Sequence, residues 1–206
     1  MTELVAHIDT FKFYKEDKPF FENISLNLKS NELNFLIGIS GVGKTTLLKS
    51  ILGILPSNTD SEVNFITDGN SYTCGQTQQL GLIGFISQTP SLVPWETIKT
   101  NIEIPNKLNN KLILPSTLEI VDELKSVGLE KSMVKLFPHQ LSFGMQSRVS
   151  IVRTLLYKPK FLFLDELFTG IDTINSMLIA KKLKSYVEIN NAVCLSYAET
   201  YCGYAN

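Results

Sequence analysis

The sequence predicts an α/β fold in which a parallel sheet forms the core and carries an antiparallel β subdomain and an inserted α-helical subdomain. Apolar runs typical of fully buried strands, with helical patterns between them, occur at 32–39, 159–166 and 191–196. Apolar and polar residues alternate at 3–13 and 21–28, which indicates two antiparallel strands. Helical patterns dominate residues 90–157, so the helical insertion lies between two strands of the core.

The elements follow one another in a consistent order. The turn "KEDKP" joins the first two strands, and the strand at 32–39 runs through a glycine-rich turn into a helix at 44–55. Residues 61–87 look β-rich and irregular and end in the apolar strand "GLIGFIS". The helical region is followed by a strand at 159–166, a helix at 174–189 and a strand at 191–196. Buried strands that alternate with helices predict a parallel sheet.

The length of 206 residues suits one compact domain with a subdomain. We therefore expect a single domain over 1–206. Its core and β subdomain are expected in 1–88 and 158–206, and its helical subdomain in 89–157.

The composition limits the possible functions. A net charge of −1 argues against broad electrostatic binding of nucleic acid. Cys74, Cys194 and Cys202 lack metal-ligand spacing, so we expect unpaired thiols in a reducing compartment. We expect no signal peptide, and no apolar run approaches the roughly 20 residues that span a bilayer. Any association with a membrane would therefore depend on a partner.

The stretch "GISGVGKTT" fits the phosphate-binding pattern G-x-x-x-x-G-K-[ST], with the required strand before it and helix after it. Its glycines let backbone N–H groups close around phosphate oxygens. Lys44 would reach the outer phosphates and Thr45 would bind Mg²⁺. The alternative is a glycine turn with an exposed lysine. The residues of this candidate nucleotide site are Gly38, Ile39, Ser40, Gly41, Val42, Gly43, Lys44, Thr45 and Thr46.

The stretch "FLFLDE" places Asp165 and Glu166 at the carboxyl end of a buried strand, the edge of a parallel sheet where ligands bind. Asp165 would hold Mg²⁺ or its water, and Glu166 would orient or deprotonate an attacking water. The alternative is an acidic turn that only favours solubility.

The stretch "PHQLSFGMQSRVSIVRTLL" reads as a helix that begins at an N-cap, Ser142, and has no acidic residue in its first turn. Ser142 and Gly144 either cap the helix or face an anion at its positive end. Three other residues do not indicate a function when each is taken alone. Gln88 could be a polar residue at a strand end, Asp172 a helix N-cap and Tyr14 an exposed aromatic residue of a strand.

In their order along the chain, the phosphate loop, Gln88, "LSFGM", "FLFLDE" and Asp172 resemble the ATP-binding cassette ATPases. The resemblance covers nearly the whole chain. The stretches "SLVPWETIKTNI" and "PHQLSFGMQSRV" are similar to the branch that imports nitrate, sulfonates and taurine. The fold that this resemblance implies is a P-loop NTPase with a RecA-like parallel sheet.

The resemblance also implies a role for each residue, with ATP and Mg²⁺ as cofactors. Tyr14 would stack on adenine, and Gln88 would contact Mg²⁺ or the attacking water. Thr45, Gln88 and Asp165 would be the metal residues, and Glu166 the general base. Asp172 would lie at the subunit boundary. The signature residues of one subunit would face the ATP of the other; these are Ser142, Gly144 and Met145.

The implied function is the ATP-binding and hydrolysing subunit of a transporter, peripheral on the cytoplasmic face of the membrane. Its partners would be membrane permease subunits, a second cassette subunit, identical or a paralogue, and indirectly a solute-binding protein. Residues 91–101 would line the groove for the permease, although Pro94 and Trp95 could instead pack at a helix start. A rival is a soluble cassette ATPase in nucleic-acid or translation work, which usually has two cassettes or basic stretches.

Three departures from the family pattern bear on catalysis. Phe143 stands where the signature has glycine, and Leu167 replaces the usual proline. The family's histidine after the last core strand is missing, and Tyr197 is the best match for that switch position. A tyrosine, with a pKa of about 10, transfers protons poorly near neutrality. The chain could therefore hydrolyse ATP slowly alone, or could be a degenerate partner that supports an active paralogue.

Overall fold

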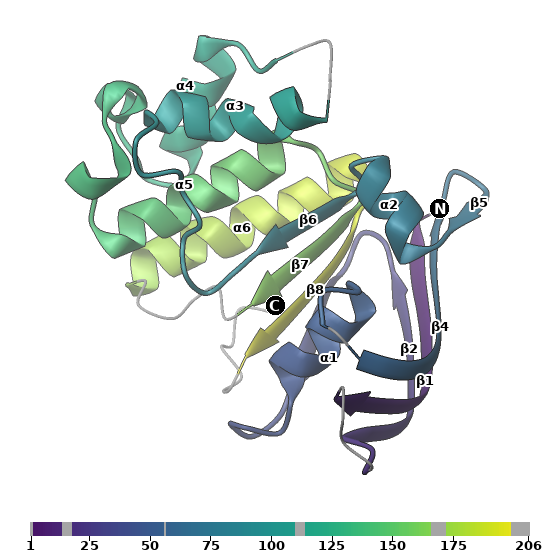
Figure 1. The fold of residues 1–206 in the computed structure, drawn as a ribbon. Helices are drawn as coiled ribbons and strands as arrows, with labels where there is room; N and C mark the ends of the chain where they lie inside the picture. The colour runs from purple at the N-terminus through teal and green to yellow at the C-terminus, as the bar shows by residue number, and fades with distance from the viewer. Residues whose placement is uncertain (1, 14–17, 56, 110–113, 166–171, 199–206) are drawn as a thin grey trace.

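The computed structural model describes residues 2–13, 18–55, 57–109, 114–165 and 172–198 (Figure 1). One of its two sheets is antiparallel and has the strand order β2-β1-β4-β5. Its strands are β1 (Glu3–Phe13), β2 (Phe21–Lys29), β4 (Ser57–Thr67) and β5 (Asn70–Tyr72). The expected antiparallel pairing of the first two strands is confirmed, because Glu3 lies opposite Lys29 and Phe11 opposite Phe21.

The second sheet is parallel, as expected, and has the strand order β3-β8-β7-β6. Its strands are β3 (Leu33–Ile37), β6 (Ile83–Ile86), β7 (Phe161–Asp165) and β8 (Val193–Ala198). In the register of the sheet, Tyr197 on β8 lies opposite Leu36 on one side and Asp165 on the other. The loop after β3, Asp165 and Tyr197 therefore meet at the carboxyl edge of the sheet.

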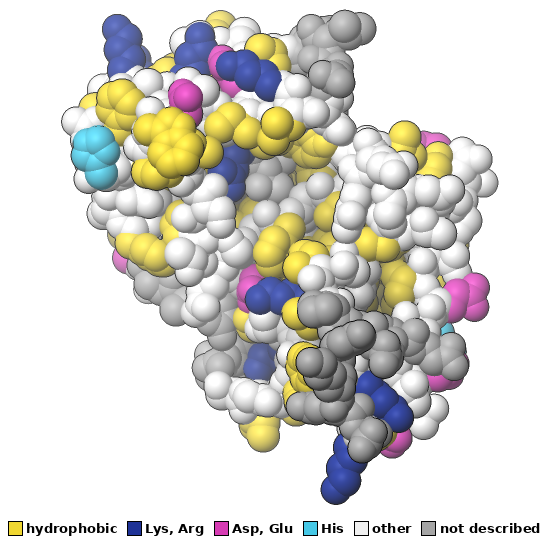
Figure 2. Space-filling view, in the orientation of Figure 1, with side chains coloured by type: hydrophobic (Ala, Val, Ile, Leu, Met, Phe, Trp, Pro, Cys, Tyr) yellow, Lys and Arg dark blue, Asp and Glu magenta, His cyan; other side chains and the backbone are white. Residues whose placement is uncertain are grey.

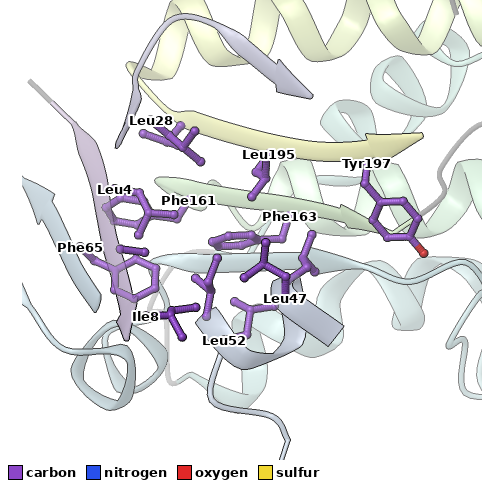
Figure 3. Close-up of a cluster of buried hydrophobic side chains, with 14 of the residues drawn as sticks. Leu4, Ile8, Leu28, Leu47, Leu52, Phe65, Phe161, Phe163, Leu195 and Tyr197 are labelled. Atoms are coloured by element: carbon purple, nitrogen blue, oxygen red, sulfur yellow. The ribbon is translucent and has the colours of Figure 1, made fainter. Parts of the chain in front are cut away.

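Helices cover both faces of the parallel sheet (Figure 1). The short helix α1 (Lys44–Ile51) lies between the two sheets, and α5 (Phe143–Leu156) and α6 (Thr173–Asn190) lie on the opposite face. Leu47 and Leu52 of α1 and its C-cap lie in the core between the sheets (Figure 3). They pack with Leu4 and Phe65 from the antiparallel sheet and with Phe163 from the parallel sheet. This apolar layer fixes α1, and with it the loop that precedes it.

The helical region has an apolar core of its own. It contains α3 (Ile98–Leu108), α4 (Thr117–Ser126), the 3₁₀ turns Lys131–Lys135 and Pro138–Gln140, and part of α5. Its fully buried residues include Ile98, Ile102, Ile120, Leu124 and Val149. Within the described ranges, none of the helices combines the length and the apolar character that crossing a bilayer requires.

Two local expectations were wrong. The segment 61–87 contains a helix, α2 (Cys74–Gln79), because Thr73 and Gln76 form a capping box that opens it. The helix that we expected over 44–55 ends at Ile51, because Gly53 takes a left-handed φ of 61° and turns the chain away.

Candidate active site

A pocket of about 300 Å³ lies where the phosphate-loop sequence meets the carboxyl edge of the parallel sheet. It is lined by Phe20, Ser40, Gly41, Gly43, Lys44, Thr45, Thr46, Gln88 and Tyr197. The loop therefore has the strand–turn–helix context that the motif requires, and the pocket opens at the N-terminus of α1. No acidic residue lies in the first turn of α1, so nothing there repels an anion.

Lys44 supplies a buried positive charge to this pocket. Its side chain is only 6% exposed, and its Nζ donates to the carbonyl oxygens of Gly38 and Ile39, each at 2.8 Å. Among the described residues, no carboxylate lies within ion-pair distance of this ammonium group. A buried ammonium without a carboxylate partner favours the binding of an anion. Three of the expected loop residues do not line the pocket: Gly38, Ile39 and Val42. The carbonyls of Gly38 and Ile39 accept the hydrogen bonds of Lys44. Val42 donates its N–H to the Ile39 carbonyl and so closes a turn in the loop.

Gly43 is the tightest point of the loop. Its φ of 100° is unfavourable for any other residue, and a Cβ there would lie 2.6 Å from the ring of Phe20 and 2.8 Å from that of Phe21. Phe20 was missed by sequence reasoning, although it lines the pocket with its ring 43% exposed. It packs edge-on against Phe13 and Phe21, at centroid distances of 5.2 and 4.7 Å. The only signal in the sequence was the adjacent aromatic pair, Phe20 and Phe21, at the start of β2.

Thr45 links the phosphate loop to the end of β7. Its Oγ1 donates a long hydrogen bond of 3.4 Å to Oδ1 of Asp165, a carboxylate that is only 5% exposed. A hydroxyl and a carboxylate oxygen are the hard ligands that Mg²⁺ prefers. No group of three or more His, Cys, Asp or Glu side chains in the described part of the chain could hold a metal alone. The pair thus fits a magnesium ion whose remaining ligands come from phosphate and water.

Tyr197, the predicted match for the switch position, lies at the pocket wall. Its hydroxyl lies 2.5 Å from Oγ1 of Thr45, and its ring centroid lies 5.7 Å from Nζ of Lys44. Gln88, which follows β6, is exposed and lines the same pocket. The structure thus brings together the phosphate loop, Gln88, Asp165 and Tyr197, which are widely separated in the sequence.

The expected signature residues, Ser142, Gly144 and Met145, do not line this pocket. Ser142 is the N-cap of α5, and its Oγ accepts from the N–H of Met145 at 3.3 Å, so the capping role is confirmed. Phe143 projects from the first turn and is 51% exposed, and Gly144 follows it. The start of α5 therefore presents Ser142 and this aromatic ring to solvent.

Arg148 fastens the start of α5 to its neighbours. Its Nε donates to the Gly144 carbonyl at 3.2 Å, and one terminal nitrogen donates to Oδ1 of Asn175 at 2.8 Å. Asp172 is the N-cap of α6 and accepts from Asn175, and these hydrogen bonds hold the pKa of its carboxyl below the ordinary value. The start of α5 and Asp172, the expected subunit-boundary residue, are thus joined by one hydrogen-bonded chain.

Two predicted residues lie outside the described residues: Tyr14, expected to stack on adenine, and Glu166, expected to be the general base. Leu167 lies outside them as well. The last described residue before this gap is Asp165, which ends β7 at the carboxyl edge of the sheet.

The comparisons with known proteins agree with this geometry. Residues 21–169 match the family model described as "ABC transporter". The aliphatic sulfonates import ATP-binding protein of Bacillus subtilis is 42% identical over 151 residues, which are 73% of this chain and 55% of that protein. The nitrate import ATP-binding protein NrtC of Synechocystis is 32% identical over 176 residues, which are 84% of this chain and 25% of that protein. The chain thus spans about half the length of the sulfonate relative, and less of the nitrate relative.

A solved structure shares the fold over the full chain. It is a dimeric ATP-binding cassette in a post-hydrolysis state, bound to ADP and Pi, with a TM-score of 0.78 and 25% identity. The match covers 100% of this chain and 90% of that one. The α/β fold expected from the sequence is therefore confirmed as that of the ABC ATPases. The chain belongs to the ABC transporter family and has the fold of its ATP-binding domain.

Proposed function

We propose that this chain is the ATP-binding and ATP-hydrolysing subunit of an import-type ABC transporter. In this account, ATP-driven closure of two cassettes moves a separate membrane permease. The observation that carries the proposal is the convergence of the phosphate loop, Gln88 and the Thr45–Asp165 pair on one pocket. The sulfonate and nitrate import proteins that it resembles support the importer direction.

The pocket suggests how the triphosphate is held. Backbone N–H groups of the loop and of the first turn of α1 would bind phosphate oxygens. Lys44 would exchange the carbonyls of Gly38 and Ile39 for the outer phosphates, because a charged acceptor gives the stronger hydrogen bond. Phe20 and the undescribed Tyr14 are the aromatic candidates for contact with the adenine.

Hydrolysis would depend on the edge of the sheet. When bound, Mg²⁺ would neutralise charge on the phosphates, and Thr45 and Asp165 are the residues that would hold it. Glu166 would orient or deprotonate the attacking water, and Gln88 would contact Mg²⁺ or the same water. Purified protein should release phosphate from ATP, and release should rise with the permease in proteoliposomes. Absence of ATP binding would refute the proposal.

Two chains would share each ATP. The residues Ser142 and Gly144 lie at the start of α5 and do not line the pocket. This arrangement fits a signature that meets the ATP of a second chain, where the N-terminus of the helix favours the γ-phosphate. Asp172 would lie at the boundary between the two chains, and its link through Asn175 to Arg148 would connect that boundary to the start of α5 within each chain. The second chain is a copy or a paralogue.

The permease would dock on the helical side of the molecule. Trp95 is 75% exposed in the segment after Gln88, so packing at the helix start does not bury it. Figure 2 shows hydrophobic side chains gathered over the helical region beside a hollow in the surface. Arg153 of α5 donates to the Ser91 carbonyl at 2.7 Å, which ties this segment to the signature helix. The proposed location is accordingly the cytoplasmic face of the membrane, with a solute-binding protein as an indirect partner.

Replacing Phe143 with glycine should strengthen ATP-dependent dimerisation about tenfold, because a ring that crowds an interface costs about 1–3 kcal/mol. The ring is exposed in the first turn of α5, so its removal should leave the core intact. Light scattering across a protein concentration series with ATP measures the effect. Leu118→Gly is the matched control, an exposed residue in the first turn of α4. Equal dimerisation of wild type and Phe143→Gly would show that the interface tolerates the ring.

Replacing Tyr197 with histidine should raise steady-state phosphate release by about 10-fold to 100-fold, because an imidazole transfers protons near neutrality. Tyr197 already lines the pocket, so the introduced ring would lie near the phosphates. Phosphate release at neutral pH measures the effect. If wild type already turns over as fast as the histidine variant, the slow-hydrolysis hypothesis is wrong.

The degenerate-partner alternative has no support from the relatives. The Thr45–Asp165 pair that would hold the metal is intact, which also gives it no support.

A further inference from the structure

The hydroxyl of Tyr197 touches the hydroxyl that would bind magnesium. Tyr197 Oη and Thr45 Oγ1 are 2.5 Å apart. The tyrosine is only 5% exposed, and its ring belongs to the core between the two sheets. In Figure 3 the ring lies at the end of this core and its oxygen points away from the other labelled side chains. Packing of the ring thus positions the hydroxyl in the pocket wall.

The direction of this hydrogen bond follows from the next one. Thr45 Oγ1 donates its only hydrogen toward Asp165 Oδ1 at 3.4 Å. When Thr45 donates to Asp165, its oxygen can only accept from Tyr197, and the Tyr197 O–H then points at the threonine oxygen. The three side chains form an ordered chain from Tyr197 through Thr45 to Asp165. In this state Tyr197 uses one of the two lone pairs of the oxygen that would bind a metal.

A metal ion at Thr45 conflicts with this contact. Magnesium would bind through the same threonine oxygen. The hydrogen that Tyr197 points at Thr45 is electropositive, and it is repelled by a dication bound to that oxygen.

We propose that the Tyr197 hydroxyl competes with Mg²⁺ for Thr45, so that the metal must displace a hydrogen bond of the nucleotide-free protein. The proposal rests on the proposed nucleotide site and adds a regulatory role to its tyrosine. Binding of nucleotide without metal leaves the Tyr197–Thr45 contact in place. Binding with metal breaks it, and the displaced hydroxyl turns its hydrogen to a phosphate oxygen.

The test compares nucleotide affinity with and without the metal. Tyr197→Phe keeps the ring and removes only the hydroxyl. The dissociation constant of a non-hydrolysable ATP analogue is measured by titration calorimetry in Mg²⁺ and in EDTA. The ratio of the two constants is the factor by which the metal raises the affinity for the analogue, here called the gain from the metal. We expect the gain in Tyr197→Phe to exceed that of wild type by about fivefold, the contribution of one net hydrogen bond.

Tyr186→Phe is the matched control. It also removes a buried tyrosine hydroxyl: Tyr186 lies on α6, and its hydroxyl donates to the Pro159 carbonyl at 2.8 Å. Tyr186 does not line the pocket. Its gain from the metal should equal that of wild type. Tyr197→Leu is a second hydroxyl-free variant and should raise the gain in the same direction. Thermal melting without nucleotide checks that each variant is folded.

The outcomes separate this proposal from the proposed function. An unchanged or smaller gain in both Tyr197 variants overturns the competition, because the hydroxyl would then be neutral or helpful to the metal. A gain that also rises in Tyr186→Phe overturns it as well, because the effect would then be general softening of the fold. Wild type that binds no analogue in either buffer refutes the nucleotide site itself, and the competition with it.

Discussion

Replacing Lys44 with alanine should weaken ATP binding by about 30-fold or more. Lys44 is buried and, in the described part of the chain, has only carbonyl oxygens as hydrogen-bond acceptors, so its charge is available to the phosphates. Removing one partner of a buried, hydrogen-bonded charge pair costs about 2–5 kcal/mol, and each 1.4 kcal/mol is tenfold in affinity. Titration calorimetry with Mg-ATP measures the loss.

Lys49→Ala provides the control for this prediction. Lys49 lies in the last turn of the same helix and does not line the pocket. Its removal changes the net charge equally, so affinity should stay within about twofold of wild type, as expected for a screened charge. If the two variants lose affinity equally, the general charge of the region binds ATP and the phosphate-loop account is wrong.

Replacing Glu166 with glutamine should lower the rate of phosphate release by about 10²-fold to 10⁴-fold, the usual contribution of a general base. Glutamine keeps the shape of the side chain but cannot accept the proton of water at neutral pH. ATP affinity should be nearly unchanged, since Lys44 and the backbone of the loop hold the phosphates. Single-turnover hydrolysis separates the chemical step from product release.

Glu188→Gln controls for the loss of a carboxylate, because Glu188 is exposed on α6 and does not line the pocket. Its turnover should match wild type. A Glu166→Gln variant that turns over at the wild-type rate would assign the base to another residue. Gln88 would then need to be tested, since it is the other predicted catalytic residue at the pocket.

The sequence could predict those parts of the site whose geometry depends on residues close together in the chain. The strand, glycine turn and lysine of the phosphate loop are contiguous, and their geometry follows from residues 32–46 alone. Asp165 was predictable because it ends an apolar strand, and a parallel sheet gathers such ends at one edge. Ser142 was predictable as a cap because N-cap preferences are local.

The parts that sequence could not predict depend on tertiary contact. Phe20 reaches the pocket because the antiparallel sheet packs over Gly43, a contact that no spacing in the chain encodes. The Tyr197–Thr45 contact depends on the strand order, which places β8 between β3 and β7. The bonds that Arg148 makes to Gly144 and Asn175 likewise join segments that only the fold brings together.

The most direct test of the account is the molar mass of the Glu166→Gln variant with and without Mg-ATP, measured by light scattering on a sizing column. The account holds that ATP is bound between the phosphate loop of one chain and the Ser142 helix of another. It predicts the mass of one chain without nucleotide and of two chains with Mg-ATP. Adding Lys44→Ala to the same variant should restore the single-chain mass. A single-chain mass in saturating Mg-ATP would contradict closure of two copies around the nucleotide.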